Sequence, residues 1–186
     1  MKNIKIKSEI FNIKNTLIVA EIGQAHEGSE GIAHSLIDAL SEVNCQAIKF
    51  QIHLADYESS FEDEFRVNFS YEDKTRYEYW KRTEFNEDQW SRIIKHCKEK
   101  EMLVGASIFS IEALKIAIEN KVDFIKIGSG DILFNELIEE VSSINLPVVV
   151  SSGMATWDEL NNICSKFTTH IENNKFALLH CTTMYP

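Results

Sequence analysis

Short apolar runs alternate with amphipathic segments along most of the chain. The apolar runs are rich in β-branched residues, as buried strands are, and occupy 16–23, 46–52, 103–109, 123–131, 147–154 and 175–183. Helical periodicity predicts helices over 29–44, 86–102, 110–121, 135–145 and 156–167. Ser29, Asn86 and Thr156 stand where helix-capping side chains are expected. A strand–helix repeat of this kind predicts parallel strands joined by right-handed crossovers.

Two architectures fit this repeat: an open doubly wound sheet, or part of a (β/α)8 TIM-type barrel. Two segments depart from the rhythm. Residues 4–15 alternate in polarity and predict a β-hairpin before the first strand. Residues 53–85 are long, aromatic and charged, so we expect a long loop that is helical around 74–82. Loops of this length often serve as functional lids.

Composition places the 186 residues among soluble globular proteins, with 44% hydrophobic and 26% charged residues. No apolar run approaches the roughly 18 residues of a membrane span. The basic N-terminal segment alternates and lacks the continuous apolar stretch of a signal peptide, so we expect a cytoplasmic protein. The net charge of −10 argues against nucleic acid and anionic membranes as partners, although a few local lysines can still bind a small anion.

The four cysteines give no sign of a zinc or redox motif, because none lies at CxxC spacing. They are Cys45, Cys97, Cys164 and Cys181. We expect small buried thiols in a reduced compartment, and Cys181 stands out only because it follows the last predicted strand.

Charged side chains stand at matching points of three predicted strands: Glu21, Lys49 and Lys126. Such charges are costly inside apolar strands unless they are paired or meet a ligand. Further polar residues follow at the carboxyl ends of the strands: Gln51, Ser107, Ser129, Asp131, Ser151 and Thr183, with Tyr185 just beyond. In parallel α/β folds this edge of the sheet is where ligands bind.

The chemistry suggested by this set is anion binding. Two lysines, several hydroxyls and the glycine-flanked amides of "GSGD" and "SSGM" can hold phosphate or carboxylate. Glu21 would then act as a general base or orient a sugar hydroxyl. The alternative is a set of internal salt bridges, with Glu21 paired to Lys49 or Lys126, which would not require hydroxyls on the neighbouring strands.

Six motifs together resemble the sialic acid synthase family over most of residues 17–186. They are "IVAEIGQAHEGS", "IKFQ", "GASIFS", "KIGSGD", "VVSSGMAT" and "LLHCTTMYP". The family includes N-acetylneuraminate synthases and their legionaminate and pseudaminate relatives, and its fold is a (β/α)8 barrel followed by an antifreeze-like domain. The resemblance implies a transferase that condenses phosphoenolpyruvate with an N-acylated amino sugar, such as N-acetylmannosamine, to a nonulosonic acid and phosphate.

The resemblance implies a phosphoenolpyruvate site among the residues at the strand ends. Lys49 and Lys126 would hold the carboxylate and phosphate, and Ser107, Ser129 and Ser151 would add hydrogen bonds.

It also implies residues around the reacting atoms and the sugar. Glu21 would contact reacting groups or the incoming water, and Asp131 would stand near the substrate; both join the two lysines in the predicted catalytic set. Thr183 and Tyr185 would face the amino sugar, and Gln51 is a further candidate for substrate binding.

A divalent metal, manganese or magnesium, is implied as the Lewis acid that polarises the sugar aldehyde. The metal-binding histidines of the family lie beyond the sixth strand, so the resemblance places no metal ligand in this chain. Three positions depart from the family's usual motifs: Ala25 replaces Asn, Ser107–Ile108 replaces Thr-Pro, and Thr183 replaces Asn or Ser. These changes leave the phosphoenolpyruvate ligands in place and leave the sugar open.

Compared with the barrel and antifreeze-like domain of the family, we expect residues 1–186 to be the N-terminal part of the barrel. They would form about six strand–helix units and would lack the last strands and the antifreeze-like domain. Such a truncated form would be inactive alone. Two alternatives stay open: a Schiff-base aldolase with Lys49 or Lys126 as nucleophile, and a non-catalytic remnant that binds phosphate or sugar or associates through open edge strands. A homodimer is left open as well.

Overall fold

Six strands form one parallel sheet in the order in which they occur in the chain. The structure, a computed structural model, describes residues 3–182 and 184. The strands, in sheet order, are β3 (Val19–Gly23), β4 (Ala47–Ile52), β5 (Leu103–Ile108), β6 (Phe124–Ile127), β7 (Val148–Ser151) and β8 (Phe176–Leu179). Each lies inside a predicted range. A doubly wound sheet would reverse its strand order at a switch point, so the sequential order selects the barrel-type architecture.

The helices follow the strands as predicted, with two additions. They are α1 (Glu30–Glu42), α2 (Ala55–Glu58), α3 (Arg76–Thr83), α4 (Glu87–Glu99), α5 (Ile111–Glu119), α6 (Asn135–Ser143), α7 (Trp157–Lys166) and α8 (Thr168–Glu172). The Ser29 side chain accepts the N–H of Ile32, which confirms it as the N-cap of α1. Asn86 and Thr156 cap α4 and α7 in reciprocal capping boxes. Helix α3 confirms the expected helix near 74–82, whereas the short α2 and α8 were not predicted.

The two faces of the sheet carry different side chains because successive residues of a strand alternate between them. On β4, Ile48, Phe50 and Ile52 pack into the main apolar core with the helices. The intervening positions, including Lys49 and Gln51, belong to the inner face. The sheet therefore has one wholly apolar face and one face available for polar chemistry.

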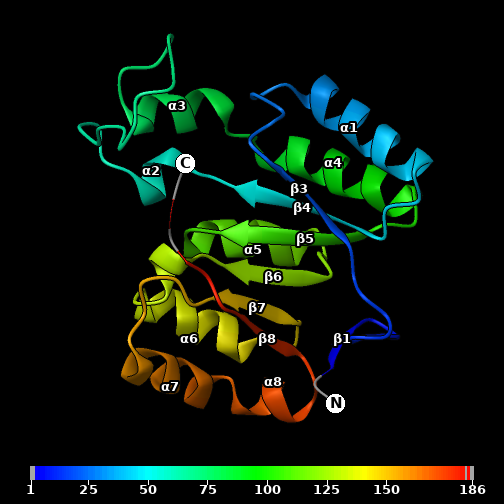
Figure 1. The fold of residues 1–186 in the computed structure, drawn as a ribbon. Coiled ribbons are helices and arrows are strands. Elements are labelled where there is room, and N and C mark those ends of the chain that lie inside the picture. Colours follow the sequence, from blue (N-terminus) through cyan, green and yellow to red (C-terminus); the bar gives the residue numbers. More distant parts are fainter. Residues whose placement is uncertain (1–2, 183, 185–186) are drawn as a thin grey trace.

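A β-hairpin fills the amino-terminal end of the inner face. Strands β1 (Ile4–Ile6) and β2 (Glu9–Phe11) pair antiparallel, as predicted. A second apolar cluster joins the hairpin to the sheet through Ile6, Phe11, Ala47, Leu103 and Phe124. In Figure 1 the hairpin lies opposite the side to which the arrowheads of β4 to β7 point. Only the carboxyl-terminal end of the inner face is left for polar side chains.

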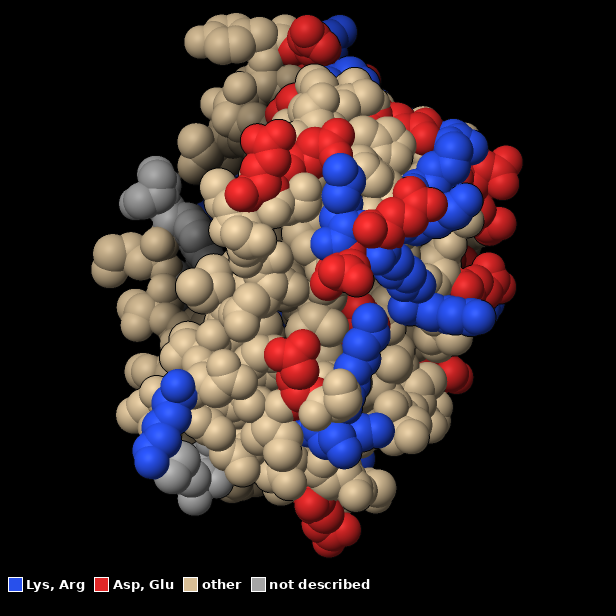
Figure 2. All heavy atoms as spheres, turned by 90° about the vertical axis from the view of Figure 1, so that its right-hand side faces the viewer, with Lys and Arg blue, Asp and Glu red and all other residues tan. Residues whose placement is uncertain are grey.

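The charged surface mixes both signs. Figure 2 shows Lys and Arg side chains interleaved with Asp and Glu on one face, rather than a basic stripe. Ion pairs of Arg92 with Glu30 and of Lys100 with Asp38 join α4 to α1. This distribution is unlike the basic footprint of nucleic-acid-binding proteins. No helix in the described part of the chain combines the length and hydropathy needed to cross a membrane.

Gly105 makes room for the ring that separates the apolar and polar ends of the inner face. Gly105 of β5 is paired in register with Phe124 of β6. A Cβ at position 105 would lie only 2.2 Å from Cζ of Phe124, a distance that real Cβ atoms do not adopt. The buried ring can lie flat over the strand only because position 105 has no side chain.

We expect Gly105→Ala to lower the free energy of unfolding by about 1–3 kcal/mol, because the ring must move out of a packed site. Urea denaturation measures the loss. Gly130→Ala is the matched control, since a Cβ there meets no atom within 4 Å. Equal losses in the two variants would contradict the steric explanation.

His26 is buried in the turn that follows β3, with 1% of its surface exposed. Its Nδ1 accepts the N–H of Gly28, and its ring lies 4.4 Å from that of Phe85, centroid to centroid. Its Nε2 is buried without a hydrogen-bond partner. Burial, with a smaller contribution from the charge of His53, lowers the pKa of His26 to about 4.

Stability should therefore fall as the pH drops from about 6.5 to about 4, because only the unfolded chain binds a proton at His26 in this window. The loss attributable to this group is up to about 3 kcal/mol. His26→Asn keeps an acceptor for the Gly28 N–H but cannot titrate, so it should flatten this part of the profile. Urea unfolding at several pH values tests this, with the partly exposed His34→Asn as control; identical slopes for wild type and His26→Asn would refute it.

Candidate active site at the carboxyl ends of the strands

Lys49 and Glu21 are paired on the inner face. The register places Glu21 of β3 beside Lys49 of β4. Lys49 Nζ makes an ion pair with Glu21 Oε2 and donates a hydrogen bond to Ser107 Oγ at 2.6 Å. The other carboxylate oxygen of Glu21 accepts the N–H of Gly23 at 2.9 Å. The salt bridge that the sequence left open between Glu21 and Lys49 is thus present, and it includes a hydroxyl from the next strand.

Lys126 carries the charge that this network does not match. It lies on β6, in register with Ser107 on one side and Val149 on the other. Its Nζ donates to the carbonyl of Ile127 at 2.8 Å, and among the described residues no carboxylate lies within ion-pair distance of it. Burial lowers the pKa of Lys126, and the charge of Lys49 lowers it further. Of the two ammonium groups, only Lys49 forms an ion pair within the described residues.

The turn after β6 brings a hydroxyl and a carboxyl to the same edge. Ser129 Oγ accepts the N–H of Gly153 at 3.1 Å and so ties this turn to the turn after β7. Asp131 folds back over Gly128, where a Cβ would lie 2.7 Å from its Oδ2. Burial raises the pKa of Asp131, and the charge of Glu58 raises it further. Asp131 therefore keeps its proton to higher pH than an exposed aspartic acid does.

The ends of β7 and β8 complete the described edge. Ser151 is buried, and a hydrogen bond from it is the main cause of a lowered pKa for the Cys181 thiol, to which Lys126 also contributes. Cys181 thus lies beside the lysine and the hydroxyls. The predicted sugar-facing residues Thr183 and Tyr185 lie outside the described residues.

Sequence reasoning missed one buried group at this edge. His53, directly after β4, contacts Glu58 of α2 and stacks against Trp80 of α3 and Phe109 after β5. A pocket of about 530 Å³ adjoins them and also reaches Gln51 and Asp131. The position of His53 just after the "IKFQ" run could have marked it as a residue at the strand end. Its partners could not be predicted, because they come from three separate segments.

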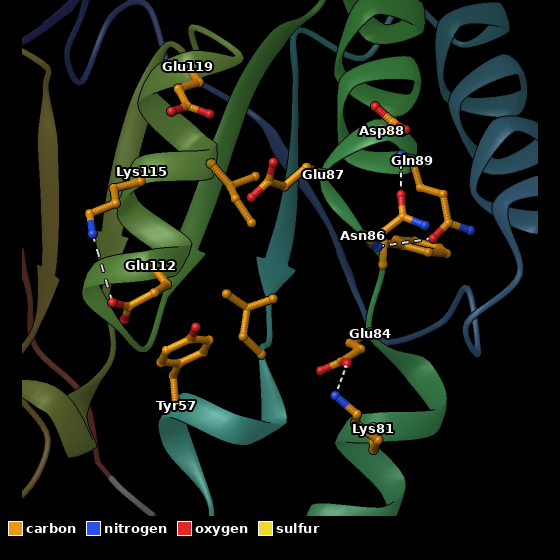
Figure 3. A pocket seen from close by; sticks show the side chains of 13 residues that line it. Tyr57, Lys81, Glu84, Asn86, Glu87, Asp88, Gln89, Glu112, Lys115 and Glu119 are labelled. Atoms are coloured by element: carbon orange, nitrogen blue, oxygen red, sulfur yellow. Dashed lines mark hydrogen bonds and ion pairs between the residues drawn. The ribbon is translucent and has the colours of Figure 1, made fainter.

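A second pocket lies on the outer side of the molecule. It measures about 670 Å³ and lies between α2, α3, the first turn of α4 and the length of α5 (Figure 3). None of the predicted site residues lines it. Four of its charged side chains form the ion pairs Lys81–Glu84 and Lys115–Glu112, and Asn86 and Gln89 serve the cap of α4. We therefore assign it no part in the site.

A divalent metal does not fit the described residues. Over residues 3–182 and 184, no three His, Cys, Asp or Glu side chains are grouped so that they could hold a metal ion. The polar groups at the strand ends are mainly ammonium and hydroxyl groups, which suit an anion rather than a cation.

Comparisons with known proteins identify the family to which the chain is similar. The model of the NeuB family matches residues 36–186. The N-acetylneuraminate-9-phosphate synthase of Drosophila melanogaster is 33% identical over 179 residues, which cover 94% of this chain and 47% of that protein. The N,N'-diacetyllegionaminic acid synthase of Campylobacter jejuni is 26% identical over 94% of this chain and 53% of its own length.

Solved structures point the same way. The N-acetylneuraminic acid synthetase of Leptospira borgpetersenii superposes with a TM-score of 0.81 at 26% identity, over 99% of this chain and 60% of that one. A truncated 3-deoxy-D-arabino-heptulosonate 7-phosphate synthase of Thermotoga maritima, 14% identical with a TM-score of 0.62, shares the fold. The chain spans about half the length of the curated relatives that it matches. Its fold is that of an incomplete TIM-type barrel, and the chain belongs to the NeuB family.

Proposed function

We propose that this chain provides the phosphoenolpyruvate-binding part of a synthase that joins phosphoenolpyruvate to an N-acylated amino sugar, forming a nonulosonic acid and phosphate. The observation that carries the proposal is Lys126, a half-buried ammonium group near Lys49 that forms no ion pair with a carboxylate among the described residues. A partly desolvated charge of this kind is costly unless a partner neutralises it. The named relatives, which make sialic and legionaminic acids, support the reaction class.

The two lysines would divide the anionic substrate between them. Lys126 is the stronger candidate for the phosphate, because Glu21 already offsets the charge of Lys49. Ser129 and Ser151 lie on the neighbouring turn and strand and would donate hydrogen bonds to the phosphate oxygens. Lys49, already bonded to Ser107, would then hold the carboxylate.

The carboxyl groups would handle protons. In the proposed reaction the methylene carbon of phosphoenolpyruvate attacks the sugar aldehyde, water adds to the resulting cationic carbon, and the tetrahedral intermediate expels phosphate. Glu21, held by Lys49 and the Gly23 amide, would accept the proton that the attacking water loses. Asp131, whose raised pKa favours its protonated form, would donate a proton to the new sugar hydroxyl.

We further propose that residues 1–186 form the N-terminal part of the barrel. In the described sheet, β3 and β8 each have only one neighbouring strand. A closed barrel would pair both edges, and the relatives are about twice as long as this chain. The antifreeze-like domain, the cytoplasmic location and the homodimer stay predictions from the sequence.

Two other functions stay in view. A partly desolvated lysine with a lowered pKa is also what a Schiff-base enzyme uses as nucleophile, so Lys126 alone does not exclude an aldolase. Borohydride trapping of pyruvate on Lys126 would favour that function, since a condensation of the proposed kind forms no imine. A non-catalytic binding protein would hold phosphoenolpyruvate without turnover in any assembly.

Lys126→Met should weaken phosphoenolpyruvate binding by at least about tenfold, because a charge-assisted hydrogen bond to phosphate is worth roughly 1.5–3 kcal/mol. Isothermal titration calorimetry with this chain measures the change. Lys95→Met, which removes an exposed lysine on α4, is the matched control and should bind like wild type. Unchanged affinity in Lys126→Met would remove the basis of the proposal.

Steady-state turnover should be absent for residues 1–186 alone with phosphoenolpyruvate, Mn²⁺ and N-acetylmannosamine, because the barrel edges are unpaired and no metal group is formed by the described residues. Phosphate release is the readout, and a full-length relative is the positive control. Turnover by this chain at a rate comparable with that control would contradict the partial-barrel proposal.

A further inference from the structure

His53 is held rigidly at the end of β4. Only 5% of its surface is exposed. Its Nδ1 lies 2.8 and 3.0 Å from the two carboxylate oxygens of Glu58, and Glu58 Oε1 also accepts the N–H of Leu54 at 2.7 Å. With this carboxylate opposite it, Nδ1 must carry a proton, so the chemical state of the ring is decided at Nε2.

Aromatic rings cover both faces of the imidazole. Trp80 stacks on one side, with centroids 3.8 Å apart and planes 6° from parallel, and Phe109 stacks on the other at 4.1 Å and 8°. The two stacked rings exclude other groups from both faces of the imidazole. Only the edge that carries Nε2 is left to act on other groups.

That edge meets Gln51. Nε2 of His53 lies 3.3 Å from Oε1 of Gln51. Gln51 is on the inner face, in register with Ser107 of β5, and its Oε1 lies towards β3 on the other side, 3.8 Å from a Cβ built on Gly23. The series Glu58, His53, Gln51 therefore leads from a buried carboxylate to the anion site.

The orientation of an amide decides what it offers to a ligand. If Nε2 of His53 donates to Oε1, the NH₂ group of Gln51 points away from the histidine and offers two donors. If Nε2 is an unprotonated acceptor, the amide must turn to donate to it and then offers its oxygen instead. An oxygen would repel a phosphate or carboxylate, whereas an NH₂ group would bind it.

We propose that His53 is a positioning residue, which fixes the amide of Gln51 with its NH₂ group towards the anion site. The part of this inference that names the recipient, a phosphate or carboxylate oxygen of the substrate, rests on the proposed function. The charged and titratable groups around the ring are Glu58 on α2, Arg76 on α3, Asp131 after β6 and His26 after β3. Glu58 is the one in direct contact.

Nuclear magnetic resonance of the ligand-free chain tests the inference without any activity. The side-chain NH₂ resonances of Gln51 should shift with pH at the same midpoint as the ring of His53. Glu58→Gln, which removes the carboxylate beside Nδ1, should change both midpoints together. His53→Asn should abolish the pH response of Gln51, and the control His34→Asn should preserve it. A Gln51 amide that ignores the titration of His53 would overturn the proposal.

A double-variant cycle then measures the effect on ligand binding. His53→Asn should weaken phosphoenolpyruvate binding by about tenfold, the value of one hydrogen bond to a charged group, but should add little in a Gln51→Ala background. Equal losses in both backgrounds would mean that His53 does not act through Gln51.

The two proposals can fail separately. Coupled titration in a chain that does not bind phosphoenolpyruvate would support the positioning role and contradict the proposed function. Binding without coupled titration would do the reverse.

Discussion

The uncompensated charge of Lys126 is the constraint around which the inner face is organised. An ammonium group on a strand of a mostly apolar sheet requires either a carboxylate or a ligand. Glu21 contacts Lys49 and the Gly23 amide, and it forms no ion pair with Lys126. The two lysines are therefore arranged as an anion-binding site would be. The hydroxyls on neighbouring strands would supply the remaining hydrogen-bond donors to the anion.

Steric features keep this polar cluster at one end of the sheet. The hairpin and the Phe124 ring fill the amino-terminal end of the inner face, so the lysines have apolar packing below them and hydroxyls above. Because Gly105 admits the ring, a single position on β5 sets the boundary between the two regions. The same packing desolvates Lys126, so fold stability and ligand binding depend on one set of contacts.

The sequence predicted the parts of this structure that local pattern controls. The strand ranges, the caps at Ser29, Asn86 and Thr156, and the position of Glu21 and Lys49 at matching points of their strands follow from periodicity. The sequence alone could not decide whether Glu21 contacts a ligand or forms a salt bridge, because both need the same residues. The structure shows the salt bridge with Lys49, which leaves Lys126 in need of a partner.

The contacts of His53 escaped prediction for a different reason. Stacking between Trp80 and Phe109 depends on where three segments meet in space, and no periodic pattern records this. Helix α2 is only four residues long, too short for a helical period to appear. The sequence indicates such contacts only through composition, here the many aromatic and acidic residues of 53–85.

These contacts also change the role of that segment. A mobile lid would be joined to the sheet by few buried groups. Here Glu58 and Trp80 hold a buried histidine, the guanidinium of Arg82 binds both carboxylate oxygens of Asp73, and Glu84 accepts the N–H of Ala55. Helices α2 and α3 are better described as a fixed wall of the site, whereas much of the stretch between them is exposed. Ordering this wall costs conformational entropy. The functional gain is a fixed position for His53 and, through it, for Gln51 at the edge where the anion would bind.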